Sequence, residues 1–318
     1  MCGIAGIVMR DGRRADPAVL QAMARAMAHR GPDGAGTWLE GPVGLVSTRL
    51  AIIDLAGGDQ PLKEPGGAVL VANGEIYNDP ELRAELADAP FVTGSDCESA
   101  LHLYRRMPAA LGERLRGMYG LAISDGGRLV LARDPFGIKP LYLVDRPDFL
   151  AFASEPQVLI AAGLASRAIL PAPRAELLQL KFTTGRRSLF ADIERTLAGE
   201  QLVLEEGRIA ARTRTPALPR GPRLTGDEDA LLGQLDAVLT DSVAHHLRSD
   251  VPYGLFLSGG IDSSVLVALM TRITHQPVYA LTAGFPGSAA ADEIGLAARV
   301  AKSGASQVRP LDRGRAAA

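Results

Sequence analysis

Cys2 is the residue whose type and position most directly suggest chemistry. Removal of Met1, which is common when the next residue is small, leaves a free α-amine on the residue that carries the thiol. An unperturbed α-amine has a pKa of about 7.7–8.0, so a useful fraction is free base near neutral pH. The amine can accept the thiol proton and later protonate a leaving group, so one residue would supply nucleophile and general base. Position alone favours the plainer interpretation, a small residue at a frayed terminus.

The stretch SGGIDSS at residues 258–264 is a second candidate, for binding phosphate. Gly259 and Gly260 allow the backbone to approach a phosphate, and the N–H groups of a following helix would point at it. Ser258, Ser263 and Ser264 add hydroxyl donors. The lysine of a Walker loop is missing, which fits a loop that holds pyrophosphate as it leaves while AMP is placed on a carboxylate. The plainer alternative is a Gly-Ser turn in an unrelated α/β unit.

The composition is that of an ordinary globular protein. The 318 residues suffice for two domains, 47% of them are hydrophobic and 22% charged, and the net charge is −2. This charge gives no electrostatic case for nucleic acid or a membrane surface as a partner. Two cysteines make neither a disulfide framework nor a metal quartet, and no apolar run approaches the ~20 residues of a membrane helix. A cytoplasmic location is expected, with Cys97 as a buried apolar filler.

The first half of the chain reads as many short strands with few helices. Asp16 and Pro17 form an N-cap and first-turn pair, and the helix behind them should bury one face that contains Leu20, Met23, Ala24 and Met27. Strands are expected at residues 43–47, 51–53, 69–72, 118–123, 129–132, 141–144 and 150–153. Such a density of strands favours sheets that pack face to face.

The character of the sequence changes at residues 212–226, where three prolines and four arginines predict a linker. Thr225 and Glu228 then form a capping-box pattern ahead of an amphipathic helix. Its buried stripe should comprise Leu231, Leu232, Leu235, Val238, Leu239, Ser242, Val243 and Leu247. His245 and His246 are expected to complement the helix dipole rather than to bind metal. A strand at 253–257, a helix at 265–271 and a strand at 278–283 would begin a parallel sheet.

Seven motifs occur in order along the first part of the chain: MCGIAGIV, HRGPDG, RLAIID, NGEIYN, TGSDCE, GMYG and ARDPFGIKPLY. Over about residues 2–210 the chain thereby closely resembles the class II (N-terminal nucleophile) glutamine amidotransferases, particularly the asparagine synthetase branch. The resemblance implies an α+β sandwich of antiparallel sheets flanked by helices over residues 2–211. A linker at 212–226 and an incomplete α/β parallel-sheet nucleotide-binding domain at 227–318 would follow.

The resemblance also implies roles for individual residues, with Cys2 as the catalytic nucleophile. Arg49 would pair with the glutamine α-carboxylate, for which a planar guanidinium is suited. Glu75 and Asp96 would take the α-ammonium. Asn73 and Gly74 look like the oxyanion hole, one side-chain amide and one backbone N–H. For Asn73 and Gly74 the alternative is a tight turn, and both interpretations can hold together.

SGGIDSS resembles the pyrophosphatase-type ATP loop of the same branch. This resemblance implies ATP and Mg²⁺ as cofactors of the second half, with none needed for glutamine hydrolysis. It would place Leu257 and Ala283 near adenine and Asp262 near magnesium. The glycines and serines of the loop would also bind ATP. The implied substrates are glutamine, aspartate and ATP, and the implied product is asparagine, formed through β-aspartyl-AMP.

The second half departs from the family pattern. A second motif of the SGxGxDE type, expected downstream, does not occur in the sequence. Only two strands of the parallel sheet are recognisable, and VRPLDRGRAAA at the end has too few apolar residues to pack, so disorder is expected there. The chain is therefore expected to be truncated and to retain only glutaminase activity.

Two alternatives to asparagine synthesis remain open. The same chemistry could amidate another carboxylate, such as a peptide or polysaccharide precursor. The chain could instead be a catalytically idle binding or regulatory remnant, although the intact set of first-half motifs counts against this. Enzymes that deliver ammonia to sugar phosphates or to phosphoribosyl pyrophosphate share the first domain but lack SGGIDSS. Assembly into a homodimer is left open.

Overall fold

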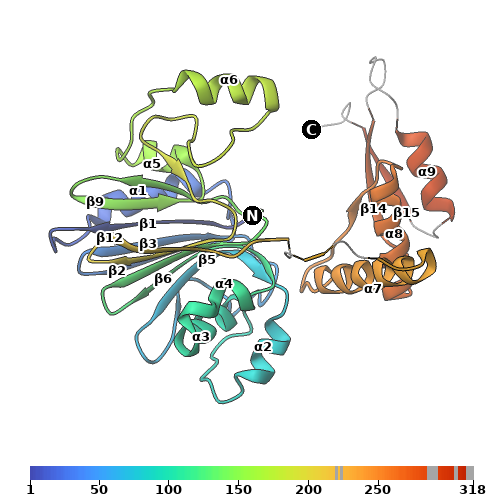
Figure 1. The fold of residues 1–318 in the computed structure, drawn as a ribbon, viewed down its shortest axis with the longest axis horizontal. Coiled ribbons are helices and arrows are strands. Elements are labelled where there is room, and N and C mark those ends of the chain that lie inside the picture. Colours follow the sequence, from blue (N-terminus) through green and yellow to red (C-terminus); the bar gives the residue numbers. More distant parts are fainter. Residues whose placement is uncertain (219–220, 223–224, 285–292, 304–306, 313–318) are drawn as a thin grey trace. The chain divides into compact units, whose positions relative to one another are not determined.

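Figure 1 shows the computed structural model of the chain, which describes residues 1–218, 221–222, 225–284, 293–303 and 307–312. The chain divides into two compact units, Met1–Arg220 and Gly221–Ala318, and each is described by itself. Within the described ranges, no helix combines the length and the apolar character that crossing a membrane requires.

Two six-stranded antiparallel sheets form the first unit. The first sheet has the order β10-β8-β9-β1-β3-β2 and comprises β10 (Glu194–Arg195), β8 (Tyr142–Asp145), β9 (Phe149–Ala153), β1 (Gly3–Met9), β3 (Val43–Arg49) and β2 (Gly34–Glu40). The second has the order β12-β11-β7-β6-β5-β4 and comprises β12 (Arg208–Arg214), β11 (Glu200–Glu205), β7 (Arg128–Arg133), β6 (Gly117–Asp125), β5 (Val69–Ile76) and β4 (Leu62–Lys63).

The two sheets pack against each other through one apolar face each. Successive side chains of a strand point to opposite faces, and β5 illustrates the result. Val69 and Val71 belong to the core between the sheets, together with Ile4 of β1. Leu70 and Ala72 belong to the core on the other side, beneath the helices. Central strands such as β3 and β5 are therefore buried on both faces, which explains why they read as continuous apolar runs.

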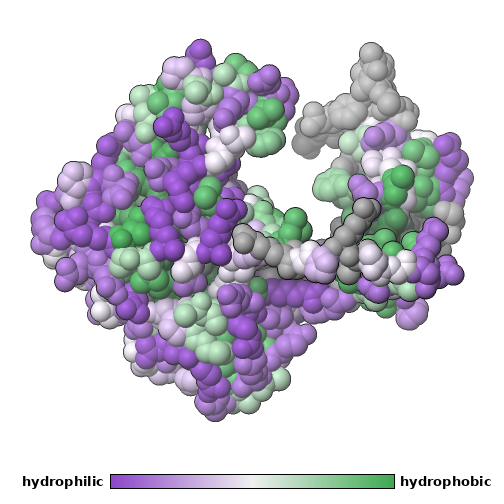
Figure 2. All heavy atoms as spheres, in the orientation of Figure 1, coloured by the Kyte–Doolittle hydropathy of each residue, from purple (hydrophilic) through white to green (hydrophobic). Residues whose placement is uncertain are grey.

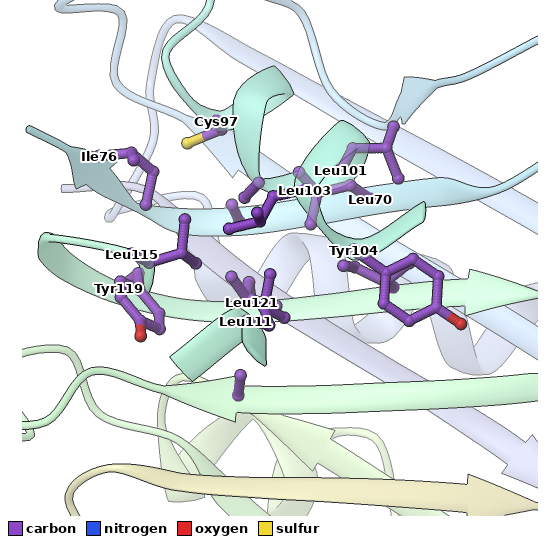
Figure 3. Packing of buried hydrophobic residues seen from close by; sticks show 14 of the residues in the cluster. Leu70, Ile76, Cys97, Leu101, Leu103, Tyr104, Leu111, Leu115, Tyr119 and Leu121 are labelled. Atoms are coloured by element: carbon purple, nitrogen blue, oxygen red, sulfur yellow. The ribbon is translucent and has the colours of Figure 1, made fainter. Parts of the chain in front are cut away.

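Helices cover the outer face of each sheet. On the second sheet lie α2 (Asp79–Glu85), α3 (Cys97–Arg106), a 3₁₀ turn (Pro108–Ala110) and α4 (Leu111–Arg114). Figure 3 shows this core, in which Leu101 and Leu103 of α3 pack with Leu70 and Leu121 of the sheet. On the first sheet lie α1 (Pro17–Met27) and α5 (Pro156–Ala161). The expected antiparallel sandwich flanked by helices is confirmed.

Several local expectations can be compared with the structure. Asp16 caps α1 by accepting from Ala18 N at 2.8 Å, and Leu20, Met23 and Met27 are buried as expected. The strand expected at 51–53 is wrong, because these residues form a loop that wraps around the side chain of Arg49. The sequence interpretation also missed β1, β2, β4, β10, β11 and β12. Glycines interrupt β1 and β2, and arginines dominate β12, so none of the three shows the apolar alternation of a strand.

One further helix, α6 (Pro171–Leu180), packs weakly, since Pro173 is its one buried residue. On the face that Figure 2 shows, hydrophilic side chains cover most of the first unit and apolar ones are scattered. Residues 212–214, assigned to the linker from composition, form the end of β12.

The second unit is a three-stranded parallel sheet with helices. The sheet has the order β13-β14-β15 and comprises β13 (Leu255–Phe256), β14 (Tyr279–Gly284) and β15 (Gln307–Asp312). The helices are α7 (Glu228–His246), α8 (Ile261–Thr274) and α9 (Ile294–Ser303). The expected parallel sheet is confirmed. The expectation of only two strands is wrong, as is that of disorder over 308–312, because this segment pairs with β14. Residues 313–318 lie outside the described residues.

Helix α7 differs from its sequence interpretation in two respects. Asp227 caps it by accepting from Ala230 N at 3.0 Å, in place of the expected box with Thr225. Of the eight residues expected in its buried stripe, Val243 is the one that is buried, whereas Leu232, Leu235 and Val238 are exposed. The amphipathic pattern therefore marks a face that the described residues of this chain do not cover.

Candidate active site

A cavity of about 380 Å³ opens at one end of the sandwich, where β1 begins and β5 ends. All six residues that the sequence singles out in the first unit line it: Cys2, Arg49, Asn73, Gly74, Glu75 and Asp96. They come from four separate segments of the chain. The volume lies within the usual range of small-molecule sites.

Strand register brings Cys2 into the cavity. In the antiparallel pair of β1 and β3, Gly3 lies opposite Thr48, so Cys2 meets the residues that follow β3. Its Sγ accepts from Leu50 N at 3.4 Å and donates to Leu50 O at 3.6 Å. Arg30, itself paired with Glu155, donates from Nε to the Cys2 carbonyl at 2.8 Å. Hydrogen bonds thus hold both the thiol and the backbone carbonyl of Cys2.

The free edge of β5 supplies a backbone donor. In antiparallel sheets the N–H groups of alternate residues point to the same edge. On the edge away from β6, Ala72 N donates to Gln60 Oε1 at 2.7 Å and Ile76 N donates to the carboxylate of Asp96. Gly74 lies between them. Its strand neighbour Tyr119 directs its own N–H and C=O at Asp134 instead, so the Gly74 N–H also points away from β6.

Asn73, which also lines the cavity, supplies a second hydrogen-bond donor, its side-chain amide. It is 1% exposed and sits on the face of β5 that looks toward the first sheet. Its Nδ2 has no hydrogen-bond partner within the described part of the chain. A buried donor left unpaired costs about 1–3 kcal/mol, so such a group calls for a ligand or a functional reason. Asn73 and Gly74 together can therefore donate to one negatively charged oxygen in the cavity.

Two carboxylates form the acidic side of the cavity. Asp96 precedes α3 and accepts from Ile76 N, which sets it next to Glu75. The loop ahead of Asp96 is held by Glu98, whose buried carboxylate accepts from Val92 N and Thr93 N, each at 2.8 Å. Burial would raise the pKa of Glu98, but hydrogen bonds from Thr93, Val92 and His102 hold this pKa below its usual value. Glu98 is thus a charged anchor for the acidic wall.

Replacing Glu98 by alanine is expected to destabilise the first unit by about 1–3 kcal/mol, since two buried N–H groups lose their acceptor. The KM for a substrate whose cationic group binds Asp96 should rise, because the loop ahead of Asp96 becomes less well ordered. The depressed pKa means that this stabilisation exists above the unfolded carboxyl pKa of about 4.3 and is lost as the pH falls through the folded value. Urea unfolding at pH 7 and at pH 4 measures it. Glu40→Ala, an exposed carboxylate at the end of β2, should change neither quantity.

The guanidinium of Arg49 is already engaged. Its Nη1 donates to Asp59 Oδ1 at 2.9 Å, and its Nη2 donates to Ile53 O at 3.1 Å and to Asp54 O. The loop at 53–59 therefore curls around the end of the side chain. Arg49 lies in the wall of the cavity, as its expected role requires, but a ligand carboxylate would have to share or displace these partners.

Sequence reasoning assigned no role to Lys139, which is 7% exposed and lines the same cavity. Its Nζ lies 3.7 Å from Met1 Sδ, and no carboxylate pairs with it within the described residues. Burial lowers the pKa of this ammonium, the Cys2 thiol opposes that shift, and Arg30 adds to it. The feature of the sequence that could have pointed to Lys139 is its position in the motif ARDPFGIKPLY. The carboxylate of Asp134 accepts from the backbone N–H of Ile138 at 2.9 Å and of Lys139 at 3.0 Å, and so fixes this turn.

In the second unit, the residues of SGGIDSS gather at the N-terminus of α8. Gly259 has a φ of +78°, and a Cβ there would lie 2.6 Å from Leu296 of α9, so glycine is required. Ser258 Oγ and Ser263 Oγ are 3.1 Å apart, and Ser264 Oγ donates to Gly260 O at 2.7 Å. The three hydroxyls therefore lie at the start of the helix, and those of Ser263 and Ser264 donate to the Gly260 carbonyl.

The remaining residues expected around a nucleotide are spread along the strand ends. Leu257 is buried and its N donates to Leu281 O at 2.8 Å, while Ala283 is exposed on β14. Asp262 is exposed in the first turn of α8. Within the described ranges, no group of three potential metal-ligating side chains occurs. A lone carboxylate fits a magnesium ion held mainly by phosphate oxygens.

Comparison with known proteins gives a consistent result. The family described as Glutamine amidotransferase domain matches residues 1–214, and the family described as Asparagine synthase matches residues 234–309. A putative glutamine-hydrolysing asparagine synthetase of Mycobacterium tuberculosis H37Rv is 37% identical over 90% of this chain and 48% of its own length. The glutamine-hydrolysing asparagine synthetase 1 of Bacillus subtilis is 36% identical over 90% and 46%. The chain thus spans about half the length of these relatives.

A solved structure shares the fold. The glutamine phosphoribosylpyrophosphate amidotransferase from B. subtilis superposes with a TM-score of 0.51 at 18% identity, over 97% of this chain and 65% of that one. The resemblance inferred from the seven motifs is confirmed by these matches. The chain belongs to the glutamine amidotransferase domain family.

Proposed function

We propose that this chain hydrolyses glutamine, with Cys2 as the nucleophile after removal of Met1. The observation that supports the proposal is that Asn73, whose buried Nδ2 has no hydrogen-bond partner among the described residues, and Gly74, whose N–H faces away from β6, line the same cavity as Cys2. Arg49 would bind the α-carboxylate of glutamine. Glu75 and Asp96 would bind its α-ammonium, since both line the cavity.

The reaction follows from this arrangement. The α-amine of Cys2 accepts the thiol proton, and the sulfur attacks the side-chain carboxamide carbon of glutamine. The tetrahedral oxyanion accepts hydrogen bonds from Asn73 and Gly74. The amine returns the proton to the nitrogen, the C–N bond breaks and ammonia leaves. Water, activated by the amine, then attacks the thioester, the C–S bond breaks, and glutamate and the free thiol are released.

We further infer that the ammonia serves ATP-dependent amidation of a carboxylate, with aspartate as the acceptor and asparagine as the product. The match of residues 234–309 and the names of the relatives support this. Ser258, Ser263, Ser264 and the N-terminus of α8 would hold the phosphates, with Asp262 near Mg²⁺. When bound, Mg-ATP supplies the adenylyl group that activates the carboxylate. Another carboxylate as acceptor remains the alternative, because nothing in the described residues binds an acceptor side chain selectively.

The test is glutamate release from glutamine by the purified chain, followed with and without ATP and aspartate. Glutamate formation is expected in all cases. Its complete absence from a chain whose N-terminus is Cys2 contradicts the proposal. Pyrophosphate release in the presence of aspartate, compared with other carboxylates, distinguishes the acceptors.

Replacing Lys139 by methionine is expected to move the acidic limb of the glutaminase pH profile to higher pH. In the chain with Met1 in place, burial lowers the pKa of the Met1 amine, the Cys2 thiol and Asp33 raise it, and Arg30 and Lys139 lower it. We expect Lys139 to act in the same direction on the Cys2 amine that loss of Met1 exposes, because both residues line the cavity. The amine must be unprotonated to act as base, so removal of a neighbouring cation raises its pKa and depresses the rate at low pH. The ratio of kcat/KM at low pH to that at high pH measures the effect.

Lys63→Met is the matched control, because Lys63 is exposed on β4 and is not part of the cavity. Its pH profile should coincide with that of the unaltered chain. A Lys139→Met profile that keeps its midpoint while KM rises at every pH contradicts this role and indicates that Lys139 contacts the substrate instead.

A further inference from the structure

The partners of Arg49 account for every N–H of its two terminal nitrogens. Nη1 donates to Leu55 O at 3.3 Å and to Asp59 Oδ1 at 2.9 Å. Nη2 donates to Ile53 O at 3.1 Å and to Asp54 O. Each terminal nitrogen carries two hydrogens, so four acceptors satisfy both. A carboxylate that binds these nitrogens in the usual two-pronged way must take the place of at least one acceptor.

Three of the four acceptors are backbone carbonyls that are fixed in place. The carboxylate of Asp54 holds the loop that carries these carbonyls, since it accepts from Gly57 N at 2.9 Å and from Gly94 N at 2.8 Å. Gly58 presses against the guanidinium, because a Cβ at this position would lie 2.6 Å from Arg49 Nη2. The carbonyls can therefore withdraw only if the whole loop moves.

The fourth acceptor is different in kind. The Asp59 side chain is 81% exposed, whereas that of Arg49 is 10% exposed. Its Arg49 contact is the one ion pair found for Asp59 among the described residues. The Asp59 carboxylate is already mostly solvated in this pair, so it can rotate into solvent at small cost once another carboxylate pairs with Arg49. Among the four acceptors of Arg49, the Asp59 carboxylate is the one with the charge and shape of an α-carboxylate.

We propose that Asp59 is an internal stand-in for the α-carboxylate of the substrate, which holds Arg49 in position while the cavity is empty and yields its place when glutamine binds. The inference rests on the proposed function, because it deepens the role of Arg49 in that site. The exchange replaces one carboxylate by another, so the buried guanidinium is paired in both states. Asp59 competes with every ligand that carries a carboxylate at this position and not with ligands that lack one.

The test compares Asp59→Asn with the unaltered chain. The KM for L-glutamine should fall on the order of threefold, the range expected from loss of an exposed ion pair, while kcat stays the same. Asp88→Asn is the matched control, since Asp88 is also an exposed partner of an arginine, but that arginine, Arg106, does not line the cavity as Arg49 does. A KM that is unchanged or higher in Asp59→Asn overturns the inference, because Asp59 would then be neutral or would support Arg49.

A binding measurement separates this inference from the proposed function. Calorimetry of the Cys2→Ala chain, with and without Asp59→Asn, uses L-glutamine and L-glutaminamide, which lacks the carboxylate. The exchange is supported if Asp59→Asn tightens the binding of L-glutamine but not that of L-glutaminamide. Equal changes in affinity for both ligands overturn it. If glutamine binds but the unaltered chain releases no glutamate, the proposed function fails while the inference is still decided. Absence of glutamine binding in every variant overturns both.

Discussion

Glutamate release is expected to fall by at least about 10⁴-fold when Cys2 is replaced by alanine, although a second thiol, that of Cys97, also lies in the wall of the cavity. The only other cysteine, Cys97, is 3% exposed within the core beneath α3, where burial raises the pKa of its thiol well above the usual value. It is therefore a poor nucleophile at neutral pH. A discontinuous assay of glutamate formation over hours sets the lower limit of the rate.

The same measurement needs two controls. Cys2 is half-buried and its Sγ makes only weak contacts with Leu50, so the Cys2→Ala chain should unfold at the same urea concentration as the unaltered one. A chain that retains Met1, verified by intact mass, should be as inactive as Cys2→Ala, because it has no amine on Cys2. Undiminished activity in either chain contradicts the proposed mechanism.

The second large effect is expected at Asn73. Asn73→Ala should lower kcat by about 10²–10³, equivalent to about 2.7–4 kcal/mol of lost transition-state stabilisation, with a smaller change in KM. The buried Nδ2 finds no acceptor in the described residues, and the adjacent Gly74, whose N–H faces away from β6, lines the same cavity. Both donors are set in place before the oxyanion forms, so little reorganisation accompanies the reaction.

Asn78→Ala is the matched control, at the N-terminus of α2. There the amide is fully used, since Nδ2 donates to Arg114 O and Oδ1 accepts from Arg116 N, each at 2.9 Å. Its loss should reduce the free energy of unfolding by about 1–3 kcal/mol and leave kcat nearly unchanged. The opposite pattern, with Asn78→Ala slowing the reaction as much as Asn73→Ala, argues against an oxyanion hole at Asn73.

Much of the fold followed from local patterns. Short apolar runs between Gly-rich turns located most central strands of the sandwich, and the order strand–SGGIDSS–helix–strand predicted a parallel sheet, because these signals act within one element. The failures lie where a distant partner decides. The apolar stripe of α7 predicts burial, but burial depends on what covers Leu232 and Leu235, and they are exposed. Likewise, 308–312 forms a strand because β14 offers it a free edge.

The sequence by itself determined the family, the fold class and a set of chemically suited residues, since these depend on residue types and on their order along the chain. Only the tertiary structure decided how the groups meet. The alternation of the sheet directs the Gly74 N–H away from β6. Among the described residues, the buried Asn73 Nδ2 has no hydrogen-bond partner and the Lys139 ammonium has no carboxylate partner, while Asp59 accepts from Arg49. Hydrogen-bond direction and desolvation arise from groups far apart in sequence, so no local pattern encodes them.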